Sequence, residues 1–94
     1  PAEDFGARTV QGVVTGEQGR PVEGAAVSLE NLATSALRSY LTQADGRYVF
    51  HRVNNFQDYR FSARYQGRSG ESKTLSRFDT SDPAVVNLKV PAGR

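Results

Sequence analysis

The chain has 94 residues, of which 37% are hydrophobic and 23% are charged, and it contains no cysteine. This length predicts one small domain and excludes a second, and no apolar run is long enough to span a bilayer. The lack of cysteine excludes disulfides and thiolate metal sites. The formal net charge is only +2, so we interpret the basic residues mainly as solvated strand faces.

The first seven residues show no periodicity and carry acidic residues and glycine. We predict a linker or frayed arm here, with Phe5 as a side chain able to pack against the edge of the domain. The chain begins with Pro1 and has no signal-like apolar block. We therefore expect a module of a longer chain, with any export signal upstream.

Apolar side chains alternate with polar ones along most of the remaining sequence, which predicts short strands. In the first strand Val10, Gly12 and Val14 share one face, and Gly12 indicates a bulge or the close approach of another backbone. No window has helical periodicity. The predicted strands cover residues 8–14, 25–30, 37–43, 47–53, 59–66, 71–77 and 84–90.

The dipeptide Asp45-Gly46 predicts a tight hairpin turn, because glycine readily adopts the positive φ that such a turn requires. The strand that follows carries Tyr48 and Phe50, which we expect in the core. For the strand before the turn, alternation leaves two arrangements open. The inward side chains are either Leu37 and Leu41, or the set Arg38, Tyr40 and Thr42.

The clearest alternation lies in residues 59–66, where Tyr59 and Phe61 share one face and Arg60 and Arg64 the other. The loop before this strand offers Phe56 as a plug for the core. Residues 71–77 form a weak polar strand that suits an edge, and Pro91 ends the last strand. The pattern predicts an all-β, seven-stranded antiparallel Greek-key β-sandwich over residues 8–91, with a tail at 92–94.

One set of turn and strand residues follows a known family pattern, namely Val10, Gly12, Val14, Gly19, Pro21, Val22, Gly24, Ala25, Val27, Thr42, Asp45, Gly46, Tyr48, Phe50 and Tyr59. These residues resemble the carboxypeptidase regulatory-like domain, well over Thr9 to Tyr65 and loosely over the remainder. The resemblance implies a transthyretin-like sandwich, similar to Cna B-type repeats, and a non-catalytic module of a larger exported protein. The chain departs from the family pattern at residues 53–58, which lack the usual turn with proline and glycine.

Some Cna B-type repeats that this chain resembles join a lysine of the first strand to an Asn or Asp of the last. Here Asn87 lies in the last predicted strand, but the first has no lysine. We therefore expect no such cross-link.

We expect no catalytic residue, cofactor or metal. The single histidine, His51, has no sequence-level pairing with a carboxylate or nucleophile, so an ordinary surface histidine is favoured. The acids Glu71, Asp79 and Asp82 do not have the spacing of a calcium loop. Residues 79–83 more simply predict a turn in which aspartate side chains accept backbone N–H groups.

The candidate binding surface is the polar face of the fifth predicted strand. It contains Arg60 and Arg64, joined by Arg38 and Tyr40 if the third strand turns its polar side outward. Such a surface can grip a carboxylate, sugar hydroxyls or a phosphate backbone. A solvated strand face is the simpler interpretation.

The sequence therefore predicts a non-catalytic accessory or interaction module of an exported bacterial protein, which spaces, supports or docks another domain. We expect a monomer in the periplasm, outer membrane or cell surface, with partners among its own chain's domains, surface proteins or glycans. A carbohydrate-binding module is one alternative, although the lack of tryptophan counts against it.

A second alternative is a single-strand nucleic-acid binder of the OB class, although we expect no nucleic-acid partner. Such a binder needs exposed aromatic rings to stack on bases. Burial of Tyr48, Phe50, Tyr59 and Phe61 would exclude it. A third alternative, an enzyme, requires His51 beside an acid in a cleft.

Overall fold

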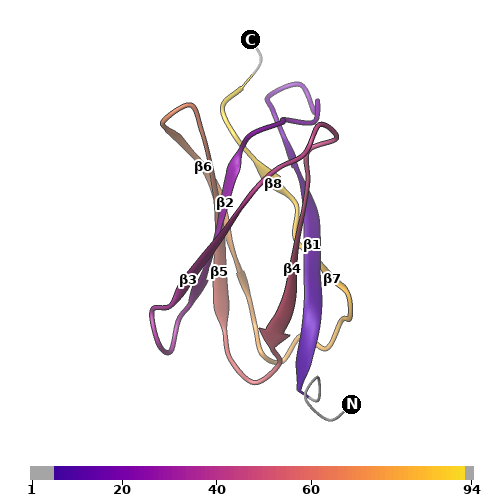
Figure 1. Ribbon diagram of the computed structural model, residues 1–94, viewed down its shortest axis with the longest axis vertical. Helices are drawn as coiled ribbons and strands as arrows, with labels where there is room; N and C mark the ends of the chain where they lie inside the picture. The colour runs from indigo at the N-terminus through magenta and orange to yellow at the C-terminus, as the bar shows by residue number, and fades with distance from the viewer. Residues whose placement is uncertain (1–5, 93–94) are drawn as a thin grey trace.

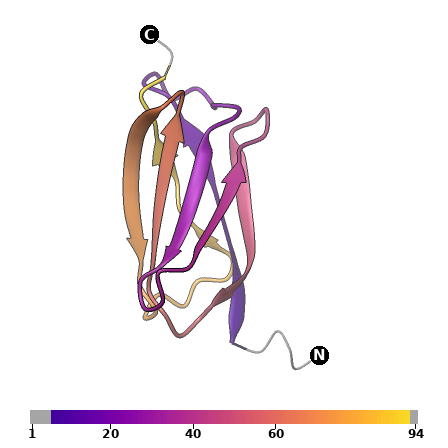
Figure 2. The ribbon, with the colours of Figure 1, turned by 60° about the vertical axis from the view of Figure 1, so that its left-hand side comes forward.

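The computed structural model describes residues 6–92, and every regular element in them is a strand. Two sheets pack face to face (Figures 1 and 2), which confirms the predicted all-β sandwich. Within these residues there is no helix able to cross a membrane. The strands are β1 (Ala7–Thr15), β2 (Ala26–Asn31), β3 (Leu37–Leu41), β4 (Arg47–Asn54), β5 (Tyr59–Tyr65), β6 (Arg68–Leu75), β7 (Ala84–Val85) and β8 (Leu88–Lys89).

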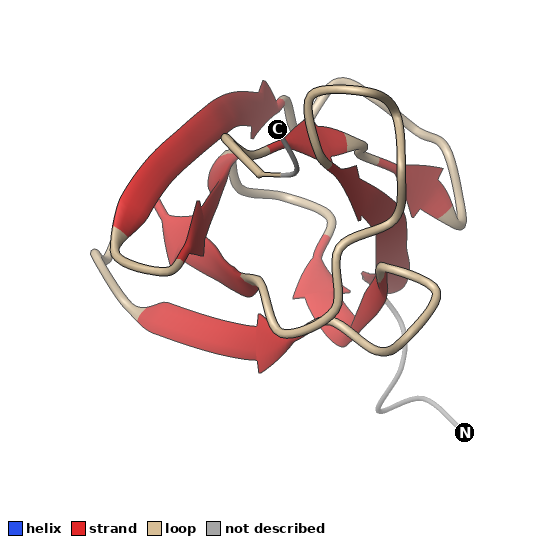
Figure 3. Cartoon of the chain, turned by 90° about the horizontal axis from the view of Figure 1, so that it is seen from above, coloured by secondary structure: helices blue, strands red, loops and turns tan. Residues whose placement is uncertain are grey.

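One sheet has the order β4-β1-β7, with β8 also pairing with β1, and the other has the order β3-β2-β5-β6. Seen from above, the two sheets form curved walls around the core (Figure 3). Most pairs are antiparallel, but β1 runs parallel to β7 and β8. The prediction of purely antiparallel sheets is wrong for the pairing of β1 with β7 and β8. After the second sheet the chain returns to run beside β1 in the same direction.

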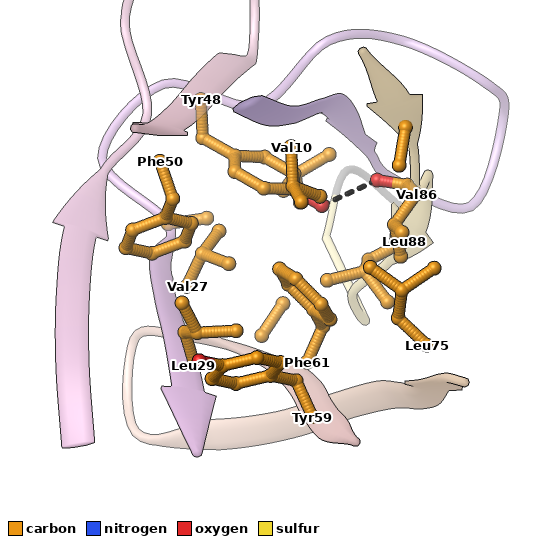
Figure 4. Packing of buried hydrophobic residues seen from close by; sticks show 14 of the residues in the cluster. Val10, Val27, Leu29, Tyr48, Phe50, Tyr59, Phe61, Leu75, Val86 and Leu88 are labelled. Atoms are coloured by element: carbon orange, nitrogen blue, oxygen red, sulfur yellow. Dashed lines mark hydrogen bonds between the residues drawn. The ribbon is translucent and has the colours of Figure 1, made fainter. Parts of the chain in front are cut away.

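The last predicted strand is divided into β7 and β8 at Val86 and Asn87. A Cβ on Gly12 would lie 1.8 Å from the Val86 carbonyl oxygen, so only glycine fits at this position. The same oxygen accepts a hydrogen bond of 2.5 Å from the Tyr48 hydroxyl (Figure 4). Asn87 Oδ1 accepts a hydrogen bond of 3.0 Å from the Val13 N–H, in place of a ladder carbonyl. Of the two alternatives predicted at Gly12, a bulge or the close approach of another backbone, the structure shows the close approach, which explains the break.

Aromatic rings from both sheets meet in the centre of the sandwich (Figure 4). The Phe50 ring centroid lies 5.8 Å from that of Tyr48 and 6.1 Å from that of Phe61, in T-shaped and tilted arrangements. These geometries suit the quadrupoles of the rings and fill a large volume. The aromatic side chains predicted to be buried in the core, namely Tyr48, Phe50, Tyr59 and Phe61, are all buried.

The turn at Asp45 and Gly46 forms as predicted, with Gly46 at φ 76° and its N–H donating to the Gln43 carbonyl at 2.8 Å. However, it joins β3 to β4, which belong to different sheets. The hairpin prediction is therefore wrong. After the turn the chain changes partner, because the Gly46 carbonyl accepts from Val14 N of β1 at 2.8 Å.

A two-residue hairpin turn lies instead between β5 and β6, at Gln66 and Gly67, which both have positive φ, at 52° and 76°. Two such residues make a turn whose twist matches that of the strands. As a result β6 begins at Arg68, three residues before the predicted start. β6 is an edge strand, as expected.

Two predictions for the ends and loops of the domain need correction. Phe56 is 70% exposed, so it is not a plug for the core. Ala7, which we assigned to the arm, begins β1, and Ala92, assigned to the tail, accepts a backbone hydrogen bond from Glu17 at 3.0 Å. The predicted position of Phe5 lies outside the described residues.

Tyr48 generates a prediction about alkaline stability. Burial raises the pKa of the Tyr48 hydroxyl above its ordinary value of 10.0. A raised pKa contributes stability that is complete below the pKa of the unfolded chain and is lost as the pH rises above it. We expect Tyr48→Phe to lower the free energy of unfolding by about 1–3 kcal/mol at neutral pH, because the Val86 carbonyl loses its donor.

The same variant should lose less stability than the wild type between about pH 9 and 11, where tyrosines of the unfolded chain ionise. Urea unfolding across this range measures both effects. Tyr65→Phe, at a half-buried tyrosine, is the control and should behave as the wild type does. An unchanged alkaline decline in Tyr48→Phe would contradict the assignment.

Candidate functional site

The four residues of the predicted binding surface lie on opposite sides of their sheet. β2 pairs Val27 with Tyr40 and Leu29 with Arg38. Directly paired residues share a face, and Val27 and Leu29 are buried. Arg38, Tyr40 and Thr42 are therefore the inward set, which resolves the alternative left open for this strand. In contrast, Arg60 and Arg64 are exposed on the outer face.

Arg38 and Tyr40 close the seam between β3 and β4. The Arg38 guanidinium donates to the His51 carbonyl at 2.7 Å and lies 5.4 Å from the centroid of the Phe50 ring. The Tyr40 ring meets Phe50 edge-on, with 6.1 Å between the centroids. Both side chains thus complete the sandwich where its two edges meet.

Arg60 and Arg64 each make one local contact. Arg60 Nη1 lies 3.3 Å from Glu30 Oε1, and Arg64 donates to the Gly67 carbonyl at 3.2 Å. Exposed ion pairs of this kind contribute little to stability. These contacts are those of a solvated strand face, and ligand binding by the two arginines stays a prediction.

The sequence did not single out a hollow on the outer face of the β4-β1-β7 sheet, which we call the outer trough. It has a volume of about 460 Å³. Its floor contains Val13, Val49 and Val85, and Gln11 lies between Val49 and Val85 in the sheet register. Arg47 also lines it. The outer trough combines apolar surface with polar groups, as small-molecule sites do.

The polar side chains of the outer trough are partly held by the protein. Arg47 Nε lies 3.5 Å from the Asp45 carboxylate, and both side chains remain largely exposed. Asn87 is fixed through its oxygen by the Val13 N–H. Asn87 is therefore oriented before any ligand arrives, which lowers the entropy cost of binding, whereas the exposed pair at Arg47 holds its side chain only weakly.

His51 lies at the junction of the outer trough with a smaller hollow of about 340 Å³ that Asp82 also lines. The His51 ring contacts the Thr9 hydroxyl, with 3.2 Å between Nδ1 and Oγ1. The Asp82 carboxylate accepts from the Thr9 backbone N–H at 3.4 Å, not from the ring. A catalytic histidine is normally oriented by an acid on its second nitrogen. Among the described residues His51 makes no hydrogen bond to an acid.

Arg8 is a buried arginine that the sequence analysis did not single out. It is 5% exposed, and its guanidinium donates to the backbone carbonyls of Asp79, Ser81 at 3.0 Å and Ser76 at 3.5 Å. The alternation of side chains along β1 could have identified it, because Arg8 lies on the same inward face of this strand as Val10. Arg8 thus anchors the loop between β6 and β7 to the first strand.

The acids considered for calcium serve the backbone instead. Asp79 accepts from the Ser81 N–H at 2.9 Å, as predicted for a turn. The hydrogen bonds from Ser81, with a smaller effect of the Arg8 charge, lower the pKa of Asp79. Glu71 accepts from the Lys89 N–H at 3.1 Å. In residues 6–92 no three His, Cys, Asp or Glu side chains gather as metal ligands.

The family model of the carboxypeptidase regulatory-like domain matches residues 9–91. The chain belongs to this family. The matched region of this carboxypeptidase regulatory-like domain extends well past residues 9–65, where the resemblance in the sequence is strongest. No match to a curated protein was found.

Solved structures share the fold of this carboxypeptidase regulatory-like domain. The dioxygenase domain of a dioxygenase and carbohydrate-binding fusion from Streptomyces sp. SirexAA-E is 14% identical, with a TM-score of 0.69, covering 99% of this chain and 85% of that one. The Bacillus anthracis TIE protein is 16% identical, with a TM-score of 0.68, covering 89% of this chain and 16% of that one.

A putative carbohydrate-binding protein from Pseudomonas aeruginosa is 18% identical, with a TM-score of 0.61, covering 95% of this chain and 96% of that one. At these identities the matches show a common fold and nothing more. The regulatory-like family and the dioxygenase neighbours therefore do not assign an activity to this chain.

The four aromatic rings whose exposure the nucleic-acid alternative requires are buried. Tyr48, Phe50 and Phe61 are at most 3% exposed, and Tyr59 is 7% exposed. Bases stack on exposed rings, and these rings are all in the core.

Arg8 generates a prediction about loop anchoring. We expect Arg8→Met, which keeps much of the buried stem, to lower the free energy of unfolding by about 3 kcal/mol, because buried carbonyls lose charged donors. Chemical denaturation measures this loss, with Arg64→Met on the exposed face as the matched control. Equal stability of the two variants would contradict the anchoring role.

Proposed function

We propose that this carboxypeptidase regulatory-like domain is a non-catalytic accessory module of a larger exported bacterial protein. In this role it sets the distance between its neighbours or docks against one of them. The family match supports the proposal. The Bacillus anthracis protein supports it too, because the region that shares this fold makes up only 16% of that chain.

The observation that carries the proposal is the direction of the first and last strands of the domain. β1 runs parallel to β7 and β8, so the chain begins the domain at one end and leaves it at the other (Figure 1). The body measures 45 × 23 × 19 Å, and this path follows its long axis. A domain with this path separates the segments before and after it, as a spacer in a linear array does.

The end at which β1 begins carries exposed aromatic side chains, which we call the β1-end aromatics, Phe56 and Phe78. They are 70% and 79% exposed. Asp58 holds their two loops together, because its carboxylate accepts from the Arg77 N–H at 2.7 Å. Exposed aromatic residues of this kind are typical of contact surfaces. They offer a docking surface for a neighbouring domain.

The spacer role is tested by replacement in the full-length protein. One version lacks residues 7–92, and another carries in their place an unrelated sandwich whose ends lie at opposite poles. Export level and activity of the whole protein are the measurements. We expect deletion to impair them and the unrelated sandwich to restore them, since a spacer supplies length alone.

A docking role predicts the opposite pattern. The unrelated sandwich should then fail, and Phe56→Ser with Phe78→Ser should impair the whole protein while the isolated domain stays folded. Full function after simple deletion would contradict both forms of the proposal.

Carbohydrate binding is a second candidate function, favoured by the outer trough. Val49 and Val85 offer apolar surface, and Gln11, Arg47 and Asn87 offer side chains that can form hydrogen bonds with sugar hydroxyls. The fold neighbour described as a putative carbohydrate-binding protein supports this candidate. Sugar sites commonly pair an apolar surface with planar polar side chains.

Affinity-gel electrophoresis over a panel of polysaccharides tests this function. We expect Gln11→Ala and Val49→Asp each to weaken retardation about tenfold, because the first removes a polar contact and the second charges the floor. Arg64→Ala, on the other sheet, is the control and should leave retardation unchanged. No retardation of the wild type, or equal loss in all three variants, would exclude a glycan site in the outer trough.

A further inference from the structure

The sandwich has four sheet edges, and three of them are visibly protected. The β4 edge has a bulge, because two of its residues, His51 and Arg52, lie opposite the single residue Thr9 of β1. Arg38 donates to the carbonyls of His51 and Arg52, at 2.7 Å and 3.5 Å. β7 and β8 contain two residues each. Bulges, short strands and charged side chains are the usual means of preventing edge-to-edge pairing.

The β6 edge is protected in a similar way. Its register with β5 shifts between Ser62 and Arg64, where β6 has an extra residue at Gly70 and Glu71. The Glu71 carboxylate accepts from the Lys89 N–H of β8. A bulge together with a charged side chain thus closes the seam between β6 and β8. The bulge of β4 and Arg38 do the same between β4 and β3.

β3 is the remaining edge. Its Arg38 reaches across to the carbonyls of β4, but β3 itself has no bulge, and among the described residues its outer face carries no charged side chain. Leu37 and Leu41 point outward and are 69% and 67% exposed, with Ser39 between them. Five residues without proline or glycine form a regular strand. An apolar and regular edge of this kind is a template for another strand.

The backbone of β3 has a free side. The Thr42 N–H donates to Ala25 and the Ala36 carbonyl accepts from Asn31, both on the β2 side. Backbone groups alternate in direction along an antiparallel strand, so those of Leu37, Ser39 and Leu41 point away from β2. In residues 6–92 no strand pairs with this side of β3.

We propose that β3 pairs antiparallel with β3 of a second copy of this chain, with Ser39 opposite Ser39 on a two-fold axis. The sequence of β3 is self-complementary in this register. Leu37 faces Leu41 of the second copy, and Arg38 faces its Tyr40. Two-fold pairing requires such self-complementarity, because each residue meets its counterpart twice.

The pairing has favourable contacts on both faces of the extended sheet. It forms about six backbone hydrogen bonds, since Leu37, Ser39 and Leu41 all direct their backbone groups outward. On the outer face, each exposed leucine gains a leucine neighbour. On the inner face, a guanidinium lies beside a tyrosine ring.

Small side chains also line the outer face where the two sheets would continue into each other. A row of serines crosses all four strands, because Ser28 is opposite both Ser39 and Ser62, and Ser62 is opposite Ser72. In the dimer this row passes through the two-fold axis and continues into the second copy. The small side chains leave the eight-stranded face without protruding groups at the junction.

This inference departs from the monomer expected from the sequence and goes beyond the proposed accessory role. The β3 edge is separate from the outer trough and from the β1-end aromatics. A short edge predicts a weak and concentration-dependent dimer, as for other small interfaces. Such pairing gains strength where copies are held close together.

Sedimentation of the 94-residue chain is the first test. We expect the average mass to rise from monomer towards dimer between about 0.01 and 1 mM, the range of weak interfaces. Ser39→Pro removes an outward N–H without touching the β2 ladder, and should raise the dissociation constant at least about tenfold. Ser39→Ala is the matched control and should still dimerise. A wild type that stays monomeric throughout overturns the proposal.

Complementary charges test the register. One variant carries Leu37→Lys with Leu41→Lys, and another carries Leu37→Glu with Leu41→Glu. In the proposed register each alone places like charges opposite each other, whereas the mixture places Lys opposite Glu. We expect association in the mixture only. Association of either variant alone to the same extent overturns the register.

A cysteine cross-link locates the axis, since the chain has no cysteine of its own. Ser39→Cys should give a disulfide-linked dimer on mild oxidation, because the two positions face each other. Ser62→Cys lies in the same serine row, two strands away, and should stay monomeric. Equal cross-linking at both positions would indicate contact through the sheet face and overturn pairing at the β3 edge.

Discussion

The structure depends on one close contact between the first and last strands. The Val86 carbonyl lies directly over Gly12, and the Tyr48 hydroxyl donates to it. This contact joins three segments that are far apart in the sequence. It fixes the parallel pairing of β1 with β7 and β8, and it anchors the central tyrosine of the aromatic core. A side chain larger than hydrogen at position 12 would separate the strands, so the contact and the glycine require each other.

Charged side chains hold the remaining boundaries of the sandwich by binding backbone groups. Arg38 closes the seam between β3 and β4, Glu71 closes the seam between β6 and β8, and Arg8 holds the loop that leads into β7. Backbone groups at edges and loops lack ladder partners and must be satisfied in another way. The charges that a search for catalysis or metal binding would first consider are therefore largely used in building the domain.

These structural roles leave three surfaces for recognition. The outer trough lies on one sheet, the β3 edge belongs to the other, and the β1-end aromatics lie at the end where β1 begins. A domain with separate surfaces can contact a ligand, a second copy and a neighbouring domain at the same time. This arrangement suits a module whose role is to position other parts of a protein.

The sequence by itself determined the two-layer β architecture, the aromatic core and the glycine at position 12, because period-two alternation and the steric demands of a strand are local properties. The same alternation contains the inward phase of Arg8, which the sequence analysis did not single out, and only the structure showed what the guanidinium binds. The tertiary structure alone decided that the turn at Asp45 and Gly46 joins two sheets, since a turn has the same local geometry whichever partner the next strand finds. It also decided the side on which Arg38 and Tyr40 lie, because both faces of β3 carry large side chains and only pairing with the buried residues of β2 distinguishes them.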